Sequence, residues 1–149
     1  PIGEGIQVVN TWTLRLPLWG LGARLAGYVS INDMPVEAFF RRASELLRQG
    51  VSIVAFPEGT RSNGPLMGPF HGTLFRLALQ EKVPIVPLCI SGNERIPARG
   101  TLLLRPGRIT LRRLPALRWE DYRDLTAFQL KNRVHELIRR ELDAMEGRA

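Results

Sequence analysis

A short turn sequence, Pro-Glu-Gly-Thr-Arg at residues 57–61, brings together side chains that could bind an anion. Gly59 has no Cβ, so the backbone can adopt a positive φ and its N–H can closely approach a ligand. Thr60 offers a hydroxyl group, and Arg61 offers a planar guanidinium that matches phosphate or carboxylate. Glu58 can hold the arginine in place or accept a hydrogen bond from a substrate hydroxyl. The turn is therefore predicted to bind a phosphate or an acid. The alternative is an ordinary polar turn with a local Glu–Arg pair.

The turn follows an apolar run, residues 51–56, which is predicted to be a buried strand that Pro57 ends. A second apolar run, Val83–Ile90, is predicted to be a strand covered on both faces. Residues 27–31 are predicted to form a short strand. Residues 107–114 alternate apolar and polar side chains, which predicts a half-exposed strand with Ile109 and Leu111 facing inward.

The clearest helix is predicted just before the first apolar run. Its apolar side chains recur at the spacing of one helical face, at Val36, Phe39, Phe40, Ala43, Leu46 and Leu47. Asn32 or Asp33 can cap its start, and Gly50 suits the position just past its end.

Three further helices are expected from the same spacing rule. A short helix is predicted over residues 16–27, and another over 70–81 with Leu74, Leu77 and Ala78 inward. A third closes the chain over residues 127–142. Its inward side chains are expected to be Leu130, Val134, Leu137, Ile138 and Leu142.

This alternation of helices and strands predicts an α/β fold, a mostly parallel sheet with helices packed on it. Residues 1–149 are expected to form a single domain, with 119–149 as a C-terminal helical extension. Ligands of such sheets gather at the carboxyl ends of the strands, and residues 57–61 lie at one such end.

The net charge of +7 is concentrated in the second half of the chain. Between Arg95 and Arg118 there are seven arginines and no acidic residue. Such a stretch could attract anionic lipids or polyphosphate, or it could be an ordinary solvated face. Nucleic acid is not an expected partner, because no helix-turn-helix, zinc or aromatic-platform signature accompanies the charge.

Apolar residues suggest two further interpretations. Trp12 and Trp19 could touch a membrane interface or belong to the core, and no apolar run approaches the roughly 18 residues that span a bilayer. Cys89, the single cysteine, is expected to be a small buried apolar residue, in a chain from a reducing compartment.

Four sequence blocks in order resemble the glycerophospholipid acyltransferases, the family of 1-acylglycerol-3-phosphate acyltransferases. The resemblance covers roughly residues 15–114. Its blocks are LPLWGLGARLAGYVSIN at 16–32, FPEGTRS at 56–62, PFHGTLFRLA at 69–78 and VPIVPLCI at 83–90.

The resemblance implies transfer of a fatty acyl group from acyl-CoA or acyl carrier protein to a hydroxyl of a lysophospholipid or glycerol phosphate. It implies that Glu58, Gly59, Thr60 and Arg61 hold the phosphate of the acceptor. Pro57, Pro84 and Pro87 would shape the pocket by stiffening its backbone. The thioester is a substrate, so no bound cofactor or metal is expected. The resemblance also implies that the protein acts at the cytoplasmic side of a membrane. It would be bound there peripherally or anchored by segments outside this chain.

The family's catalytic histidine, with an aspartate five residues later, has no counterpart here. The residues five positions after His71 and His135 are Arg76 and Arg140. We therefore expect the catalytic pair upstream of Pro1, in a chain that starts just after that block. The alternatives are a natural loss of catalysis and a non-catalytic module that binds lipid or acyl thioester. His71 is expected to be a surface residue at a helix start, and His135 a solvated one.

A second departure concerns the acceptor. Asp33 stands where the family commonly has an arginine that also meets the acceptor phosphate. The acceptor's head group, the acyl chain length and the oligomeric state are therefore left open.

Overall fold

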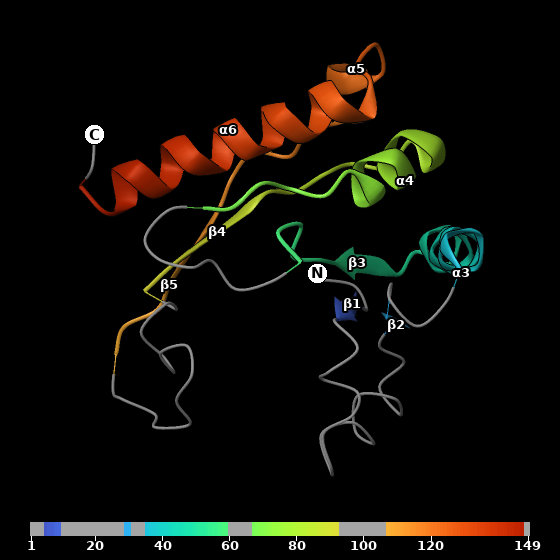
Figure 1. Cartoon of the computed structure of the whole chain (residues 1–149), viewed down its shortest axis with the longest axis horizontal. Coiled ribbons are helices and arrows are strands. Elements are labelled where there is room, and N and C mark those ends of the chain that lie inside the picture. Colours follow the sequence, from blue (N-terminus) through green and yellow to red (C-terminus); the bar gives the residue numbers. More distant parts are fainter. Residues whose placement is uncertain (1–4, 10–28, 31–34, 60–66, 93–106, 148–149) are drawn as a thin grey trace. The chain divides into compact units, whose positions relative to one another are not determined.

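The computed structural model describes residues 5–9, 29–30, 35–59, 67–92 and 107–147 (Figure 1). The chain divides into two compact units, Pro1–Thr60 and Arg61–Ala149, which are described separately. The expected single domain stays a prediction. The helix expected over residues 16–27 lies outside the described residues, as do Trp12 and Trp19.

The first unit contains a three-stranded parallel sheet in the order β2-β1-β3. Its strands are β1 (Gly5–Val9), β2 (Val29–Ser30) and β3 (Ser52–Val54). Val8 pairs with Val29 on one side of β1, and Ile6 pairs with Ile53 on the other. Because all three strands are parallel, the chain leaves each of them at the same edge of the sheet.

Helix α3 (Val36–Arg48) precedes β3 and packs against it. Phe39, Ala43 and Leu46 are buried, which confirms the predicted face, but Val36 at its start is 48% exposed. The predicted cap is wrong. Pro35 occupies the capping position without a side-chain hydrogen bond, so the residue at that position is neither Asn32 nor Asp33.

The end of α3 is the expected glycine turn. Gly50 has a φ of +81°, a backbone conformation that glycine adopts at little cost. The Gly50 N–H donates to the Leu47 carbonyl and the Val51 N–H donates to the Leu46 carbonyl, both at 3.0 Å. This pair of bonds is a Schellman motif, which satisfies the last carbonyls of the helix and directs the chain into β3.

Strand β3 is less buried than its apolar sequence predicted. Ser52 and Val54 are exposed and Ile53 is half-buried, so the expectation of a buried strand is wrong. In the part of the chain that the structure describes, β3 is an edge strand with α3 packed against it. An apolar run alone does not tell whether both faces of a strand are covered.

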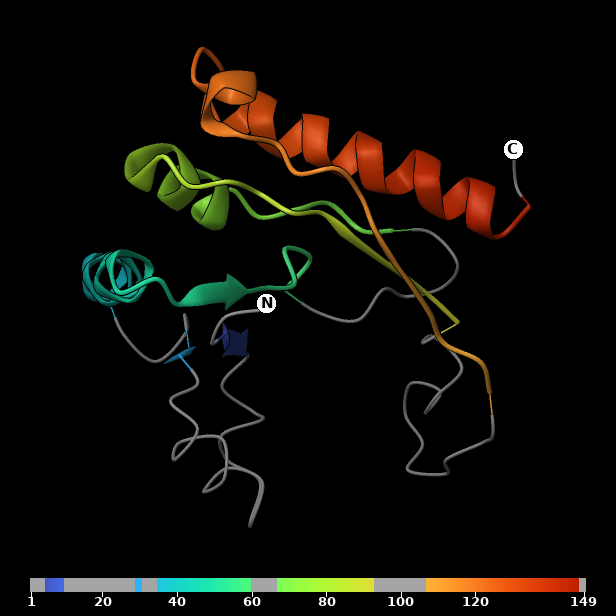
Figure 2. The ribbon, with the colours of Figure 1, turned by 180° about the vertical axis from the view of Figure 1, so that it is seen from behind.

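In residues 67–92 and 107–147, the second unit has three helices and an antiparallel pair of strands. The elements are α4 (Thr73–Glu81), β4 (Leu88–Ser91), β5 (Thr110–Arg113), α5 (Trp119–Tyr122) and α6 (Ala127–Met145). Leu88 pairs with Arg113, and Ser91 pairs with Thr110 at the other end of the ladder. Helix α6 lies along β4 and also packs on α4, as both ribbon views show (Figures 1 and 2).

The ladder continues beyond β4 and β5 with a change of register. Ile85 and Leu117 exchange two backbone hydrogen bonds, of 2.9 and 2.8 Å. Ile85 precedes Pro87 by two positions, whereas Leu114 precedes Leu117 by three on the opposite strand. The extra residue forms a β-bulge within Leu114–Leu117, which bends the chain toward α5.

One apolar cluster forms the core of this unit. Its residues come from α4, β4, α5 and α6 and from the segments beside these elements. They are Phe70, Phe75, Cys89, Leu117, Tyr122, Leu130, Val134 and Ile138. The buried Tyr122 hydroxyl makes hydrogen bonds with the carbonyls of Ala78 and Val83, which ties α5 to the end of α4.

In the second unit, the side chains of residues 86–89 are buried on the face of the strand that α6 covers and exposed on the other face. Pro87 and Cys89 are buried, whereas Val86 and Leu88 on the other face are each 41% exposed. The strand covered on both faces, predicted over Val83–Ile90, is therefore wrong. The inward face predicted for residues 107–114 is also wrong, because Ile109 and Leu111 are exposed.

Helix α6 confirms the predicted C-terminal helix. Leu130, Val134 and Ile138 are buried, whereas Leu137 is 37% exposed and does not belong to the inward face. The helix starts with a capping box, in which the Gln129 N–H donates to the Thr126 hydroxyl at 3.3 Å and the Gln129 side chain accepts from the Thr126 N–H.

Candidate functional site

The predicted anion-binding turn begins at Pro57, three residues after the end of β3. Gly59 has a φ of +67°, and its N–H donates to the Phe56 carbonyl at 3.0 Å. This confirms that the turn uses the positive φ that glycine allows. Pro57 and Glu58, the two residues inside this hydrogen-bonded turn, are half-buried, and Gly59 is exposed.

Two of the predicted site residues, Thr60 and Arg61, lie outside the described residues. The structure therefore places Pro57, Glu58 and Gly59, and the anion-binding role of Glu58–Arg61 stays a prediction. The place of Pro57, Glu58 and Gly59 in the fold agrees with the expectation for α/β proteins, because the chain leaves β3 at the edge of the sheet where β1 and β2 also end. Asp33 follows β2 by three residues in the sequence and also lies outside the described residues.

The two prolines predicted to shape a pocket, Pro84 and Pro87, differ in their surroundings. Pro84 is exposed, whereas Pro87 is buried and its carbonyl accepts a hydrogen bond of 3.0 Å from the Leu114 N–H. Ile85, between them, exchanges two hydrogen bonds with Leu117. Residues 84–87 are thus held by backbone bonds on one side and restricted by two proline rings. Their role in a pocket stays a prediction.

The two histidines have different environments. His71 is exposed and directly precedes Gly72, the capping residue of α4, as the sequence predicted. His135 was expected to be solvated, and this is wrong. Its Nε2 lies 3.1 Å from the Gly68 carbonyl oxygen, and its ring meets the Phe70 ring edge-on at 4.8 Å between centroids.

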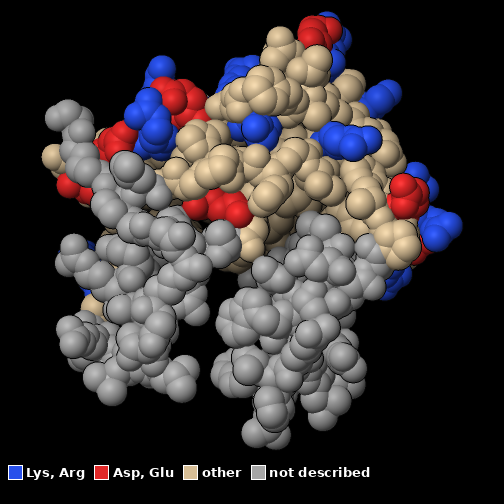
Figure 3. All heavy atoms as spheres, viewed as in Figure 1, with Lys and Arg blue, Asp and Glu red and all other residues tan. Residues whose placement is uncertain are grey.

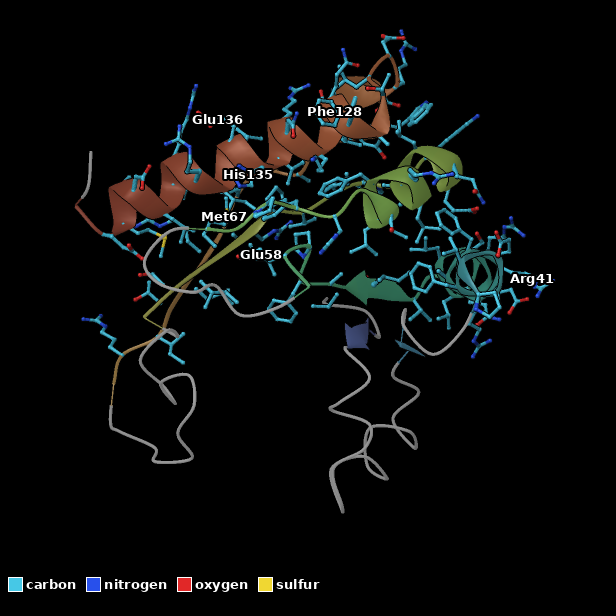
Figure 4. All side chains as sticks on the ribbon, in the orientation of Figure 1. Arg41, Glu58, Met67, Phe128, His135 and Glu136 are labelled. Carbon is cyan, nitrogen blue, oxygen red and sulfur yellow. The ribbon has the colours of Figure 1, made fainter. Side chains whose placement is uncertain are left out.

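The helical register explains the position of His135. His135 precedes Ile138 by three residues and Leu142 by seven, so it shares the inward-facing side of α6. Figure 4 shows His135 on the side of α6 that faces the segment at Met67, with Glu136 on the outer side. The spacing was therefore a signal that could have placed this histidine from the sequence.

The outer surface of α6 carries paired charges. Glu136 accepts hydrogen bonds from Arg139 at 2.8 Å and from Arg140 at 2.7 Å, and these bonds lower the pKa of its carboxyl to about 2. Figure 3 shows acidic and basic side chains next to each other at the C-terminal half of this helix. These charges therefore form local pairs and not a uniform basic field.

The arginine-rich stretch is only partly described. Arg112 pairs with Glu141 of α6, whereas the exposed Arg108 and Arg113 form no ion pair with another described residue. Arg95, Arg99 and Arg105 lie outside the described residues. A cationic surface at β5 and the residues just before it therefore rests on Arg108 and Arg113.

Cys89 confirms the expectation of a small buried residue. It is fully buried, and its thiol lies 3.9 Å from the Ile138 carbonyl. Burial and, to a smaller extent, the charge of Glu141 raise the pKa of the thiol, although Arg112 opposes the shift. A thiol that stays protonated is a poor nucleophile.

Two kinds of feature are absent from the residues that the structure describes. None of the described helices has the length and apolar character needed to cross a bilayer. The same residues contain no group of three histidine, cysteine or acidic side chains placed to hold a metal ion.

Comparisons with known proteins agree on one family. Residues 6–91 match the family model described as Acyltransferase. The chain is 30% identical to a 1-acyl-sn-glycerol-3-phosphate acyltransferase of Limnanthes alba, over 98% of this chain and 53% of that protein. It is 33% identical to the alpha form of that enzyme from Ovis aries, over 80% of this chain and 43% of that protein. The chain thus spans about half the length of the curated relatives it matches.

A solved structure supports the fold. The crystal structure of the 1-acyl-sn-glycerophosphate acyltransferase PlsC from Thermotoga maritima matches with a TM-score of 0.78 and 22% identity, over 95% of this chain and 57% of that chain. This likeness confirms the predicted α/β fold class.

Proposed function

The chain belongs to the Acyltransferase family, and we propose that it serves the transfer of a fatty acyl group from a thioester to a hydroxyl of a glycerophospholipid precursor. The proposal takes the acceptor to be a lysophospholipid and the donor to be acyl-CoA or acyl carrier protein. The family match over residues 6–91, which includes the turn that follows β3, is the observation that supports it.

Within this reaction we assign the acceptor-binding role to Glu58–Arg61. Gly59 has no Cβ and adopts a positive φ, so a ligand can approach the backbone closely at the point where the chain turns. Arg61 would form a charge-assisted, bidentate pair with a phosphate. Glu58 would hold the guanidinium or accept a hydrogen bond from the acceptor's hydroxyl.

The base that activates the acceptor hydroxyl is not assigned to these 149 residues. An alcohol is a poor nucleophile until a base with a pKa near 7 removes its proton. Neither His71 nor His135 has an aspartate five residues later, and His135 is committed to the Gly68 carbonyl. We propose that a histidine and an aspartate outside these residues supply the base.

Binding of lysophosphatidate by the 149-residue chain tests the acceptor role. The ligand is a short-chain form held below its micellar concentration, and titration calorimetry measures its affinity. Arg61→Ala is expected to weaken binding about 10-fold to 100-fold, because a hydrogen bond to a charged group contributes about 1.5–3 kcal/mol.

Monoacylglycerol, which has no phosphate, is the matched control ligand, and the Arg61→Ala change is expected to leave its binding unchanged. Equal losses for both ligands, or none for either, would remove Arg61 from the acceptor site. Asp33→Arg, which restores the family's usual residue, is expected to strengthen lysophosphatidate binding if the acceptor carries a phosphate monoester. No gain would favour a different head group.

The alternative is a non-catalytic module that binds lipid or acyl thioester on the same scaffold. An acyl-transfer assay on the natural protein, with radiolabelled acyl-CoA and lysophosphatidate, separates the two functions. Labelled phosphatidate supports the enzyme. Binding of the lipid without any labelled product supports the module.

We also propose peripheral binding to anionic membranes at the cytoplasmic side. Residues 108–113 support this, because Arg108 and Arg113 are close in sequence to Ile109 and Leu111, which are 52% and 62% exposed. A basic residue close to an anionic surface contributes about 1 kcal/mol. The chain is expected to float with anionic vesicles at low salt and to be released at high salt. Failure to float at low salt would contradict the proposal.

A further inference from the structure

The contact between α6 and the segment before α4 joins two parts of the chain that the family match separates. Gly68 and Phe70 lie within the matched residues 6–91, whereas His135 lies 44 residues beyond its end. The C-terminal helical extension thus contributes a polar side chain to a stretch that is characteristic of the family.

The hydrogen bond at this contact has a defined direction. The Gly68 carbonyl oxygen can only accept, so the Nε2 of His135, 3.1 Å away, must carry the proton and donate it. This fixes the tautomer of the imidazole as the form protonated at Nε2 when the ring is neutral.

Aromatic packing holds the same segment in a second place. The His135 and Phe70 rings meet edge-on at an interplanar angle of 74°, and Phe70 stacks on Phe75 of α4 at 6.3 Å between centroids. Phe70 and Phe75 are both buried, whereas His71, between them in the sequence, is exposed. The segment is therefore held at Gly68 and at Phe70, and both contacts use one side chain.

We infer that His135 is a positioning residue for residues 68–72. This stretch and α6 belong to the same unit of the chain, and the inference does not depend on the proposed function.

Backbone ¹⁵N relaxation of the 149-residue chain tests the positioning directly. Order parameters for Gly68 and Phe70 are expected near ~0.85 in the wild type and below about 0.6 in His135→Ala, because the variant loses both contacts. His135→Gln keeps an N–H donor and is expected to recover most of the order at Gly68. Glu136→Gln, on the outer side of α6, is the matched control and should change neither value.

The tautomer of His135 tests the hydrogen bond itself, because packing of the ring alone does not determine which nitrogen carries the proton. The ¹⁵N shifts of His135 are expected to report a proton on Nε2. A ring protonated only at Nδ1 would overturn the assignment, as would unchanged order at Gly68 in His135→Ala. If His135→Ala does not fold, His135→Gln and the wild-type tautomer decide the question.

Discussion

The two units of this chain are stabilised in different ways. Among residues 35–59 of the first unit, the buried side chains lie on one helix, α3, and β3 has none. In the second unit, buried side chains from three helices and a strand form one cluster. The turn proposed to bind the acceptor follows β3, whose side chains are exposed or half-buried. Glycines with a positive φ shape the chain on both sides of this strand, Gly50 before it and Gly59 in the turn after it. The second unit depends instead on contacts between residues far apart in sequence.

Removal of a buried side chain from the cluster is expected to have the largest effect on stability. Leu130 is fully buried on α6, and Leu130→Ala is expected to lower the free energy of unfolding by about 2–5 kcal/mol. Phe128→Ala on the same helix is the matched control, because Phe128 is 66% exposed, and it should change stability by less than about 0.5 kcal/mol. Urea unfolding measures both. Equal effects would contradict the cluster as the core of this unit.

One glycine with a positive φ from each unit allows the cost of a substitution to alanine to be compared between the units. Gly50, at +81°, has open space within 4 Å of the position that a Cβ would take, so Gly50→Ala should cost only the left-handed backbone, about 1–2 kcal/mol. At Gly92, with φ at +88°, a Cβ would lie 2.2 Å from the Arg108 carbonyl oxygen. Gly92→Ala should cost about 1–3 kcal/mol more, because the backbone must move. Thermal unfolding of both variants ranks them, and the reverse order would refute this account.

The starts of α6 and α3 differ as well. Helix α6 has a side-chain cap at Thr126, whereas α3 starts at Pro35 without one. Thr126→Ala is expected to lower the free energy of unfolding by about 1 kcal/mol, because the Gln129 N–H loses its partner. Thr126→Ser keeps the hydroxyl and should lose much less. A large loss with serine would show that the methyl group of Thr126, and not its cap, stabilises the helix.

The smallest effect is expected from the exposed charges on α6. The two arginine bonds lower the folded-state pKa of Glu136 from 4.5 to about 2. The stabilisation is therefore fully present above pH 4.5 and is lost as the pH falls toward 2. Denaturant unfolding of the wild type and Glu136→Gln should differ slightly near neutral pH and converge at a pH of about 2. A difference that grows on acidification would have the wrong sign for this pair.

The sequence predicted the elements better than it predicted their surroundings. The helices α3, α4 and α6 were predicted because their apolar side chains follow the helical repeat over two or more turns. The burial of Val86 and Leu111 was predicted wrongly, because an apolar run shows which residues favour a strand but not which face a neighbouring helix covers.

The candidate site was predictable where chemistry is local. The positive φ at Gly59 follows from the residue type and its place in a turn, and the structure confirms it. The contact between His135 and Gly68 joins positions 67 residues apart, and no local pattern encodes such a pairing. The register of α6 could have indicated only that His135 faces inward, and the sequence-based expectation of a solvated residue missed even that.

The position of Cys89 has a consequence for kinetics. The chain has a single thiol, and it lies under α6 against the Ile138 carbonyl. A thiol reagent can reach it only after the helix has moved away, so the rate of labelling under native conditions reports how often the helix opens. Labelling of Cys89 in the wild-type chain therefore measures the opening of its C-terminal helix, with no added probe and no competing cysteine.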